Sequence, residues 1–274
     1  QTLTVHPMPK AKFTINDTVQ CAQNNAFVFT ANSTIAYGTL KHKWWLAQNF
    51  RDSGIVIAKS FNAADTPIIQ LVTVSDKLCT DTLERLVFVQ PSPKSYFTVN
   101  QLGQCLKINQ FDALNRATVP HGFMRFVWRI SDGFVSTDTS ISHKFAKHGD
   151  FKIRLWVSSN YDCVDSFEQG VLVHPDPVAN FKVNDAGQCV KGNQFVFSNL
   201  STIDSTQMAY DWSFGDGDTS RLKAPTHTYL FYGNYKVMLT ARSAYNCQDS
   251  FKATMFVNPM PRARFSLNDT DQCV

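Results

Sequence analysis

The seven cysteines are the residues of this chain that are best suited to covalent chemistry, and they fall into two regular series. One series recurs every 84 residues and each member follows a glutamine; it comprises Cys21, Cys105, Cys189 and Cys273. The other has the same spacing, with an aspartate two positions later; it comprises Cys79, Cys163 and Cys247. Regular cysteine usage indicates a disulfide framework. Buried free thiols are the alternative, and the absence of a C-x-x-C pair or a histidine cluster disfavours zinc.

Acid–base chemistry has weaker candidates. His143 and His227 share one position of the 84-residue period, and Asp216 and Asp218 lie close together in a Gly-Asp-Gly turn. Carboxylates in such a turn usually accept hydrogen bonds from backbone amides. The sequence has no G-x-S-x-G elbow, phosphate-binding loop or H-E-x-x-H motif. No set of residues supplies a nucleophile, a base and oxyanion donors together, so we expect that the chain is not an enzyme.

Oxygen ligands that could hold calcium recur at the end of the first expected strand of each block. They are Asn16-Asp17, Asn184-Asp185 and Asn268-Asp269, whereas the second block has Asn100-Gln101. Such groups suit a hard cation, but a turn in which they cap the backbone explains them more simply. We therefore expect no cofactor, with Ca²⁺ as the alternative.

Two tryptophans are candidates for contact with a partner. Trp44, Trp128 and Trp212 recur with the 84-residue period and are expected in the core. Trp45 follows Trp44, and Trp156 follows the apolar Leu155, so the alternation of strand side chains directs both outward. An exposed tryptophan suits a surface glycan or another chain of a filament; cover by a neighbouring loop is the alternative.

The whole chain repeats with the same 84-residue period as these residues. Pro-x-Pro pairs begin at Pro7, Pro91, Pro175 and Pro259, each 84 residues after the last. The pattern predicts the end of one block at 1–8, three blocks at 9–92, 93–176 and 177–260, and the start of another at 261–274. The chain lacks an initiator methionine and residues 1–5 resemble a strand, so we expect a segment of a longer array without a signal peptide.

Each block is predicted to be a β-sandwich. In the third block, residues 210–214 alternate between apolar and polar side chains, residues 195–197 and 235–239 have alternate side chains that would face in and out of a sheet, and Gly215–Asp218 is a turn. Several short strands separated by turns at regular spacing are typical of an antiparallel sandwich of about seven strands. No segment shows sustained helical periodicity.

Composition excludes two classes of partner. The net charge is +4 without a basic stripe, which disfavours nucleic acid. No apolar stretch reaches the ~20 residues that a membrane-spanning helix needs, so we expect no membrane insertion.

The third block resembles the polycystic kidney disease (PKD) domain, whose signature is W-x-F-G-D-G, P-x-H-x-Y and G-x-Y-x-V-x-L. The matching segments are Trp212–Gly217, Pro225–Tyr229 and Gly233–Leu239. The second block keeps part of this signature, and the first has Ala47-Gln48-Asn49 in place of the Gly-Asp-Gly turn. The resemblance implies an all-β fold, a tandem array of immunoglobulin-like (PKD-type) antiparallel β-sandwiches.

Paired cysteines and the V-x-P-x-P-x-A-x-F junction at Val257–Phe265 narrow the resemblance. They are similar to PKD-type repeats of giant surface proteins and gliding-motility adhesins of Bacteroidota-type bacteria. This similarity implies a secreted, cell-surface filament or stalk whose partners are neighbouring repeats. The alternative is a glycan-binding accessory PKD array of a secreted hydrolase.

Two disulfide schemes remain open. Pairing within a block would join Cys21–Cys79, Cys105–Cys163 and Cys189–Cys247, but strands of about nine residues would separate these cysteines by ~30 Å. Pairing across block junctions would join Cys21–Cys163 and Cys105–Cys247. Because prolines fix φ and no Gly/Ser linker is present, we also expect the junctions to be semi-rigid couplings.

Overall fold

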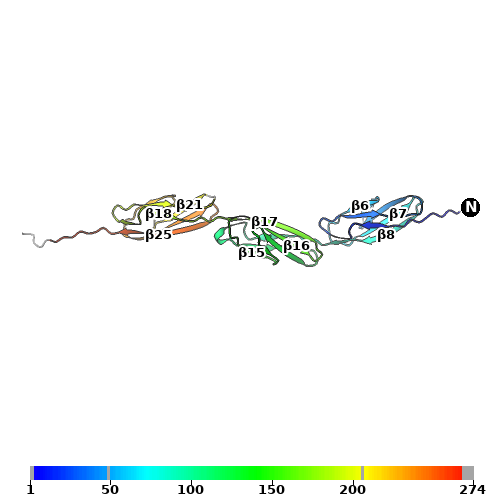
Figure 1. Ribbon diagram of the computed structural model, residues 1–274, viewed down its shortest axis with the longest axis horizontal. Coiled ribbons are helices and arrows are strands. Elements are labelled where there is room, and N and C mark those ends of the chain that lie inside the picture. The colour runs from blue at the N-terminus through cyan, green and yellow to red at the C-terminus, as the bar shows by residue number, and fades with distance from the viewer. Residues whose placement is uncertain (1–2, 48–49, 205–206, 267–274) are drawn as a thin grey trace, which may run out of the picture. The chain divides into compact units, whose positions relative to one another are not determined.

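The computed structural model describes residues 3–47, 50–204 and 207–266, and within these the chain is almost entirely β-structure (Figure 1). The one helical element among the described residues is a single 3-10 turn, η1 (Leu106–Ile108). The chain forms two compact units: residues 1–100, 112–142 and 152–170 make the first, and residues 101–111, 143–151 and 171–274 make the second. Within the described segments, no helix is long and apolar enough to cross a membrane.

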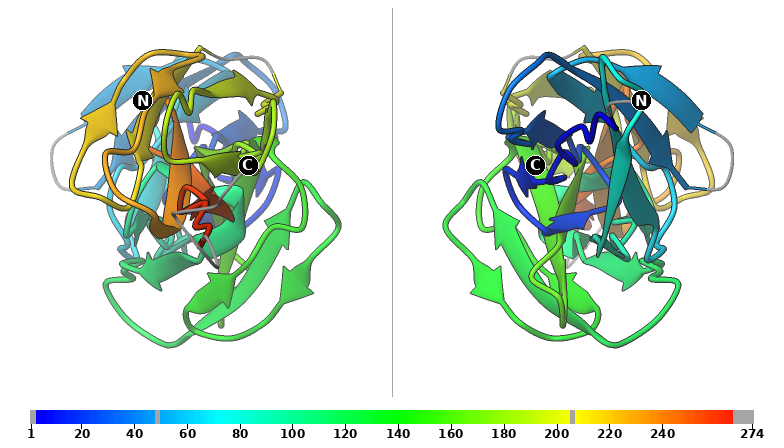
Figure 2. Two further views of the ribbon diagram at one scale, coloured as in Figure 1. Left: turned by 90° about the vertical axis from the view of Figure 1, so that its left-hand side faces the viewer. Right: turned by 90° about the vertical axis from the view of Figure 1, so that its right-hand side faces the viewer.

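The third repeat shows the sandwich most plainly. Its strands are β18 (Phe181–Val183), β19 (Gly187–Cys189), β20 (Phe195–Asn199), β21 (Met208–Ser213), β22 (Thr219–Ser220), β23 (Thr226–His227), β24 (Gly233–Ser243) and β25 (Gln248–Asn258). One sheet has the order β18-β20-β23 and the other the order β19-β25-β24-β21-β22. Figure 2 views the strands nearly end-on, with β24 and β25 in orange.

The first two repeats use the same plan. The first contains β1 (Phe13–Ile15), β2 (Val19–Cys21), β3 (Phe27–Ala31), β4 (Leu40–Leu46), β5 (Phe50–Ser53), β6 (Val56–Lys59), β7 (Ile68–Ser75), β8 (Thr80–Leu86) and β9 (Phe88–Gln90). The second contains β10 (Phe97–Val99), β11 (Gly103–Cys105), β12 (Phe111–Asn115), β13 (Met124–Ile130), β14 (Val135–Ser136), β15 (Ile141–His143), β16 (Gly149–Ser159) and β17 (Val164–His174). Tandem immunoglobulin-like sandwiches are therefore the architecture, as the sequence predicted.

Periodic aromatic residues form the cores. Trp44, Trp128 and Trp212 are 0–1% exposed, which confirms their predicted inward position. Each indole Nε1 donates to a backbone oxygen ten residues on, as Trp212 does to Leu222 at 2.9 Å. A phenylalanine of the first strand packs against each tryptophan, and for Phe97 and Trp128 the ring centroids lie 5.0 Å apart. A buried tryptophan with a satisfied N–H combines a large apolar area with no unpaired donor.

Two details differ from the expectations. One strand pair in each repeat is parallel: β2–β9, β11–β17 and β19–β25. The first cysteine of each repeat lies in the first strand of this pair. Residues 3–5 form no strand, unlike the expectation.

A glycine supports the tight turn of the third repeat. Gly215 has φ 87°, and a Cβ atom there would lie 2.9 Å from the backbone N and O of Lys236. The positive φ and the close approach of the Lys236 backbone each favour glycine over a residue with a Cβ atom. In the first repeat, the replacement turn keeps a left-handed residue at Ala47 (φ 50°), while Gln48 and Asn49 lie outside the described residues.

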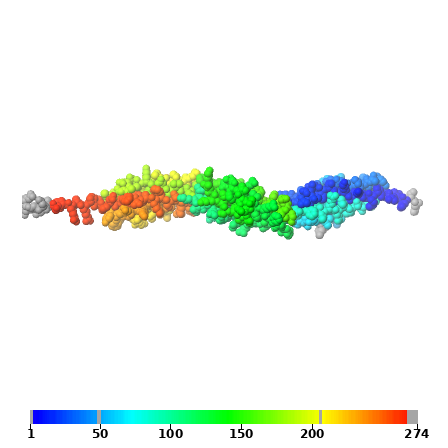
Figure 3. Space-filling view, turned by 60° about the horizontal axis from the view of Figure 1, so that its bottom comes forward, coloured from blue at the N-terminus to red at the C-terminus, as the bar shows by residue number. Residues whose placement is uncertain are grey.

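The described residues that follow β25 belong to neither sheet of the third repeat. The described part of this stretch, residues 259–266, forms no strand and is exposed; Figure 3 shows it in red as a narrow extension. The predicted block boundaries at the proline pairs stay predictions.

Candidate functional site

Each unit contains one disulfide between successive repeats. Cys21 bonds to Cys163 in the first unit, with Cα atoms 5.6 Å apart, and Cys105 bonds to Cys247 in the second, with Cα atoms 5.5 Å apart. Both pairs span 142 residues. Of the two open schemes, the structure contains the pairing across junctions. We call the surroundings of Cys21–Cys163 the first junction and those of Cys105–Cys247 the second junction.

Parallel strand pairing explains why a disulfide between the two cysteines of one repeat is excluded. Cys189 in β19 lies opposite Asn258, the last residue of β25. Cys247 immediately precedes the start of the same eleven-residue strand. At 3.3 Å per residue the two ends of β25 lie roughly 33 Å apart, far beyond the ~7 Å that a disulfide allows between Cα atoms.

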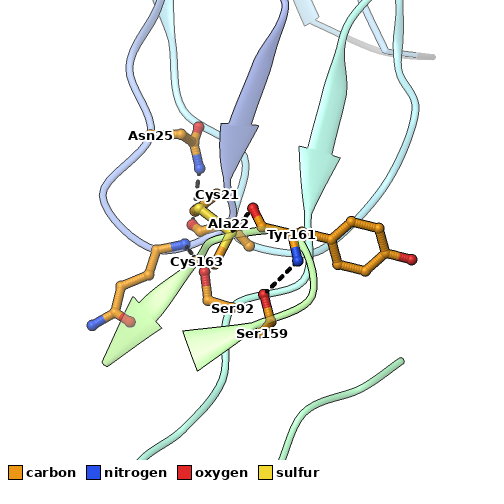
Figure 4. Close-up of a disulfide and its surroundings, with 8 residues drawn as sticks. Cys21, Ala22, Asn25, Ser92, Ser159, Tyr161 and Cys163 are labelled. Carbon is orange, nitrogen blue, oxygen red and sulfur yellow. Dashed lines mark hydrogen bonds between the residues drawn. A yellow bond between two sulfur atoms is a disulfide. The ribbon is translucent and has the colours of Figure 1, made fainter. Parts of the chain in front are cut away.

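A buried asparagine fixes the loop that follows the first cysteine. Asn25 Nδ2 donates to the backbone oxygens of Ala22 (2.8 Å) and Phe61 (2.7 Å), and its Oδ1 accepts from the Phe61 amide. Figure 4 shows Asn25 beside Cys21. Asn109 and Asn193 make the same three bonds in the later repeats. The asparagine therefore ties each cysteine loop to its own sandwich.

A tight turn positions the second cysteine. The Ser159 amide donates to the Cys163 carbonyl at 2.8 Å, and Asp162 takes a left-handed φ of 59°. Ser159 Oγ accepts from the Tyr161 amide, as Figure 4 shows. The turn at Ser243–Cys247 repeats the main-chain bond at 2.8 Å. Both turns contain a left-handed residue directly before the cysteine, Asp162 and Asn246.

The aspartate two residues after each second cysteine accepts a backbone hydrogen bond from the start of its own repeat. Asp81, Asp165 and Asp249 accept the backbone amides of Ala11, Ser95 and Ala179 at 2.7–3.0 Å. These residues begin the sandwich just after each Pro-x-Pro pair. The C-x-D pattern thus joins the cysteine turn to the start of its own repeat.

Polar bonds accompany each disulfide. In the first junction, the Gln23 amide donates to Ser92 Oγ at 2.9 Å. In the second, the Lys107 amide donates to Asp176 Oδ2, and Lys107 Nζ forms an ion pair with Asp249 Oδ1 at 2.8 Å. The Lys107 hydrogen bond lowers the pKa of Asp249, and the same bond raises the pKa of Lys107.

Aromatic and histidine contacts add to the second junction. The rings of His174 and Tyr245 stack with centroids 3.8 Å apart and an interplanar angle of 15°. His148 Nε2 lies 3.3 Å from Asp204 Oδ2. Tyr245 corresponds to Tyr161 in the first junction, but His174, His148 and Asp204 correspond to Gln90, Ala64 and Pro120. The two junctions therefore share the disulfide but not all of its neighbours.

Three cysteines remain outside the two disulfides. Cys79 is half-buried and Cys189 is exposed, and both are free thiols in the structure. Cys273 lies outside the described residues.

The two candidate tryptophans lie in different surroundings. Trp156 is half-buried, and the guanidinium carbons of Arg129 and Arg154 lie 5.5 and 5.1 Å from its ring centroid. Trp45 lines a surface pocket together with Gln70 and Glu84, which hydrogen bond to each other at 2.6 Å. Charged side chains therefore cover part of Trp156, while Trp45 borders a polar hollow. A partner for either residue stays a prediction.

The acidic and histidine residues of the third repeat form a local network. His227 Nε2 lies 2.7 Å from Asp216 Oδ2, and the His227 ring stacks on Phe214 at 4.1 Å. Desolvation opposes ionisation of Asp216, yet hydrogen bonding to His227 keeps its pKa below the ordinary value. Tyr229 Oη donates to the Phe214 carbonyl at 2.8 Å, and burial raises the pKa of Tyr229. The network ties the turn to the core.

The candidate calcium ligands bind backbone groups. Asn16 Oδ1 accepts from the Val28 amide and Asp17 Oδ1 from the Val19 amide, both at 2.9 Å. Asn184 and Asp185 accept equivalent backbone bonds. Asn268-Asp269 lies outside the described residues. Calcium at these positions stays a prediction.

Sequence reasoning missed the asparagine anchors. Asn25, Asn109 and Asn193 lie 84 residues apart, four residues after each first cysteine. The period therefore contained the signal, but an asparagine beside a turn usually caps local backbone. Its bond to a residue 36 positions away became visible only in the folded sandwich.

Comparison with known proteins identifies a domain type. Residues 174–258 match the PKD domain family and are a PKD domain, a non-catalytic domain type. A 90-residue stretch is 33% identical to the pre-pro-metalloprotease PrtV of Vibrio cholerae; it covers 32% of this chain and 9% of that protein. The chain thus spans about a tenth of the length of this curated relative.

Two solved structures are similar to parts of this chain. The PKD1 domain of the V. cholerae metalloprotease PrtV is 31% identical over 30% of this chain and 98% of that chain, with a TM-score of 0.27. The eight N-terminal immunoglobulin domains of Down Syndrome Cell Adhesion Molecule match with a TM-score of 0.59 at 10% identity, covering 93% of this chain and 37% of that chain. The latter similarity concerns the immunoglobulin-like fold alone.

Proposed function

We propose that this chain, with a PKD domain at residues 174–258, is a structural repeat segment of an extracellular cell-surface filament or adhesin stalk. The PKD domain match and the similarity of the fold to solved immunoglobulin domains support an extracellular repeat or accessory role. In the proposed role the repeats act as a semi-rigid spacer in adhesion or gliding motility, and the chain has no catalytic function.

The disulfide across each junction is the observation that carries this proposal. A covalent bond between successive repeats restricts how far they can turn against each other, and in the second junction the Lys107–Asp249 ion pair adds to it. Disulfides persist in oxidising compartments outside the cytoplasm. A spacer that holds a distant group away from a cell needs both properties, stiffness and survival outside the cell.

Small-angle X-ray scattering tests the spacer role. The chain would be compared with a variant without junction disulfides (Cys21→Ser, Cys163→Ser, Cys105→Ser, Cys247→Ser). A control variant would carry Cys79→Ser and Cys189→Ser, which leave both junctions intact. We expect a broader distribution of interatomic distances for the junction variant alone. Identical scattering from all three proteins would contradict a stiffening role of the disulfides.

Protease treatment of intact cells tests the location. Cells that make the full-length protein would lose this segment to an added protease if it is on the surface. A segment that is protected in intact cells and degraded only after lysis would contradict a surface location.

The similarity to a protease favours a second candidate, an accessory array of a secreted hydrolase that binds glycans. Trp45 is its best residue, because an aromatic ring beside amide and carboxylate groups combines an apolar face with polar groups that fix orientation. A glycan array with the Trp45→Ala and Trp156→Ala variants would test it. Binding that Trp45→Ala abolishes would favour this role, and no binding by the unmodified chain would count against it.

A further inference from the structure

We propose that the outward face of β13 and β16 in the second repeat binds an acidic polysaccharide, with a sugar ring against Trp156 and its carboxylate on Arg129. The inference goes beyond the proposed spacer role and rests on neither disulfide. It assigns a partner of stated chemistry to the face that carries Trp156, and it adds Arg129 and Arg154 to that face.

The two arginines and the tryptophan lie together on the solvent side of the larger sheet. Leu155 and Val157, the neighbours of Trp156 along β16, are 0% exposed and face the core, so alternation turns Trp156 outward. Arg129 of β13 lies directly opposite Arg154 of β16 in the antiparallel pair. We call Arg129, Arg154 and Trp156 the arginine–tryptophan face.

The charges on this face are unequally matched. Arg154 Nε donates to Glu168 Oε2 at 2.9 Å, and Lys152 Nζ lies 3.0 Å from Oε1 of the same carboxylate. Arg154 and Lys152 thus share one anion. Within the part of the chain that the structure describes, Arg129 has no carboxylate within ion-pair distance. Two like charges directly opposite on a sheet destabilise it, and a ligand carboxylate on Arg129 would relieve this repulsion.

The surroundings keep the face cationic. Arg125 on β13 and Lys152 on β16 are exposed as well, which makes four cations with the two arginines of the face. The exposed carboxylates that point outward from the same strands and from β17 are Glu168 and, at the start of β16, Asp150. An excess of one sign of charge raises the local concentration of ligands of the opposite sign.

Trp156 adds an apolar requirement to the charge. The guanidinium carbons of Arg129 and Arg154 lie 5.5 and 5.1 Å from the centroid of its ring. An anion held by Arg129 would therefore have the indole ring beside it. A uronic acid meets both requirements, because its carboxylate is attached to a sugar ring that has an apolar C–H face. Guanidinium groups suit carboxylates because they can donate two parallel hydrogen bonds.

The position of the face within the sheet favours a sugar chain over an acidic peptide. In the order β11-β17-β16-β13-β14, both β16 and β13 are interior strands. Extended peptides often gain affinity by adding a strand to an open sheet edge, and the ladder between β16 and β13 offers no such edge. Recognition on this face must come from side chains alone.

The other repeats show that the fold does not require these residues. The counterparts of Arg129, Arg154 and Trp156 are Trp45, Gln70 and Val72 in the first repeat and Ser213, Met238 and Thr240 in the third. All three repeats form the same sandwich around the same core tryptophan. The arginine–tryptophan face is therefore a property of the second repeat and not of the architecture.

Calorimetric titration of the whole chain with polygalacturonate, a polymer of uronic acids, tests the inference. Dextran serves as a neutral sugar chain and poly-glutamate as an acidic peptide. We expect binding to polygalacturonate that weakens at high salt, and weaker binding to the other two polymers. Dextran bound as tightly as polygalacturonate would overturn the role of the arginines. Poly-glutamate bound as tightly would overturn the assignment to a sugar and indicate an acidic protein partner.

Side-chain variants locate the site. Arg129→Gln should weaken binding of polygalacturonate roughly tenfold, the loss expected for a hydrogen bond between charged groups, and Trp156→Ala should weaken it as well. Arg116→Gln, at an exposed arginine just after β12 of the other sheet, should leave the affinity unchanged. An unchanged thermal midpoint of the exposed Arg129→Gln variant would show that its loss of binding is not a loss of folding.

Equal affinity of Arg129→Gln and the unmodified chain, or no binding of polygalacturonate at all, would overturn the inference. All of these variants keep both junction disulfides. Their scattering therefore still reports the spacer role, and failure of one proposal is distinguishable from failure of the other.

Discussion

Lys107 and Asp249, which are 142 residues apart in the sequence, form an ion pair of 2.8 Å beside the Cys105–Cys247 disulfide. Asp249 also accepts the Ala179 amide, so one carboxylate serves both the second junction and the entry of the third repeat. The electrostatic and covalent links of this junction therefore involve neighbouring residues, since Lys107 lies two positions after Cys105 and Asp249 two positions after Cys247.

Acid should weaken this ion pair. The pKa of Asp249 is lower in the folded chain than its ordinary value, chiefly through the Lys107 hydrogen bond. Its contribution to stability is therefore present above the ordinary carboxylate pKa and is lost as the pH falls through the lowered pKa. In thermal unfolding from pH 7 down to pH 2, the difference between the chain and Lys107→Met should shrink. A difference that stays constant with pH would show that the pair does not contribute through ionisation.

The buried asparagine that anchors the cysteine loop should contribute strongly to the free energy of unfolding. Asn193→Ala removes two donated bonds and one accepted bond at a residue that is 4% exposed. Because buried backbone groups are left unsatisfied, we expect a loss of roughly 3 kcal/mol in the free energy of unfolding. Denaturant titration would measure it, with the exposed Lys191→Ala as control. Equal midpoints for the two variants would contradict the anchoring role.

At Tyr229, replacement by phenylalanine removes a single hydroxyl group, and replacement by alanine serves as the comparison. The first two repeats have Phe61 and Phe145 at this position, so Tyr229→Phe keeps the packing and removes only the bond to the Phe214 carbonyl. We expect a loss of about 1 kcal/mol, against roughly 3–5 kcal/mol for Tyr229→Ala, which also leaves a cavity. Denaturant midpoints of the two variants would compare them. A Phe variant as unstable as the Ala variant would place the stability in the hydroxyl group instead.

Loss of the first disulfide should expose the segment between the first two repeats. The Cys21→Ser, Cys163→Ser variant removes a cross-link that closes 142 residues, for which chain-entropy estimates give at most about 5 kcal/mol. Trypsin cleavage after Lys94, an exposed residue next to Pro93, should become faster. The Cys79→Ser, Cys189→Ser variant should be cleaved as slowly as the unmodified chain. Unchanged cleavage in the junction variant would contradict the coupling.

The sequence predicted the fold well because the signals were local and repeated three times. Trp212 and its counterparts, the Gly215 turn and the alternation in β24 all follow from residues within one repeat. The constant 84-residue spacing of equivalent residues then extended the prediction to the first repeat, where the turn motif is absent.

The site was less predictable because it depends on which end of a strand each cysteine occupies. Only the parallel pairing of Cys189 with Asn258 places this cysteine at the far end of β25 from Cys247. The role of Asp249 was hidden for the same reason, since its partners Lys107 and Ala179 are distant in sequence. A contact between residues distant in the sequence cannot be derived from the local pattern around either of them.

Peptide mapping of the unreduced, alkylated chain tests the central claim most directly. Covalent coupling of successive repeats predicts that proteolysis releases one linked peptide pair containing Cys21 and Cys163 and another containing Cys105 and Cys247. Linked pairs that join Cys21 to Cys79 or Cys105 to Cys163, or free thiols at all four junction positions, would contradict it.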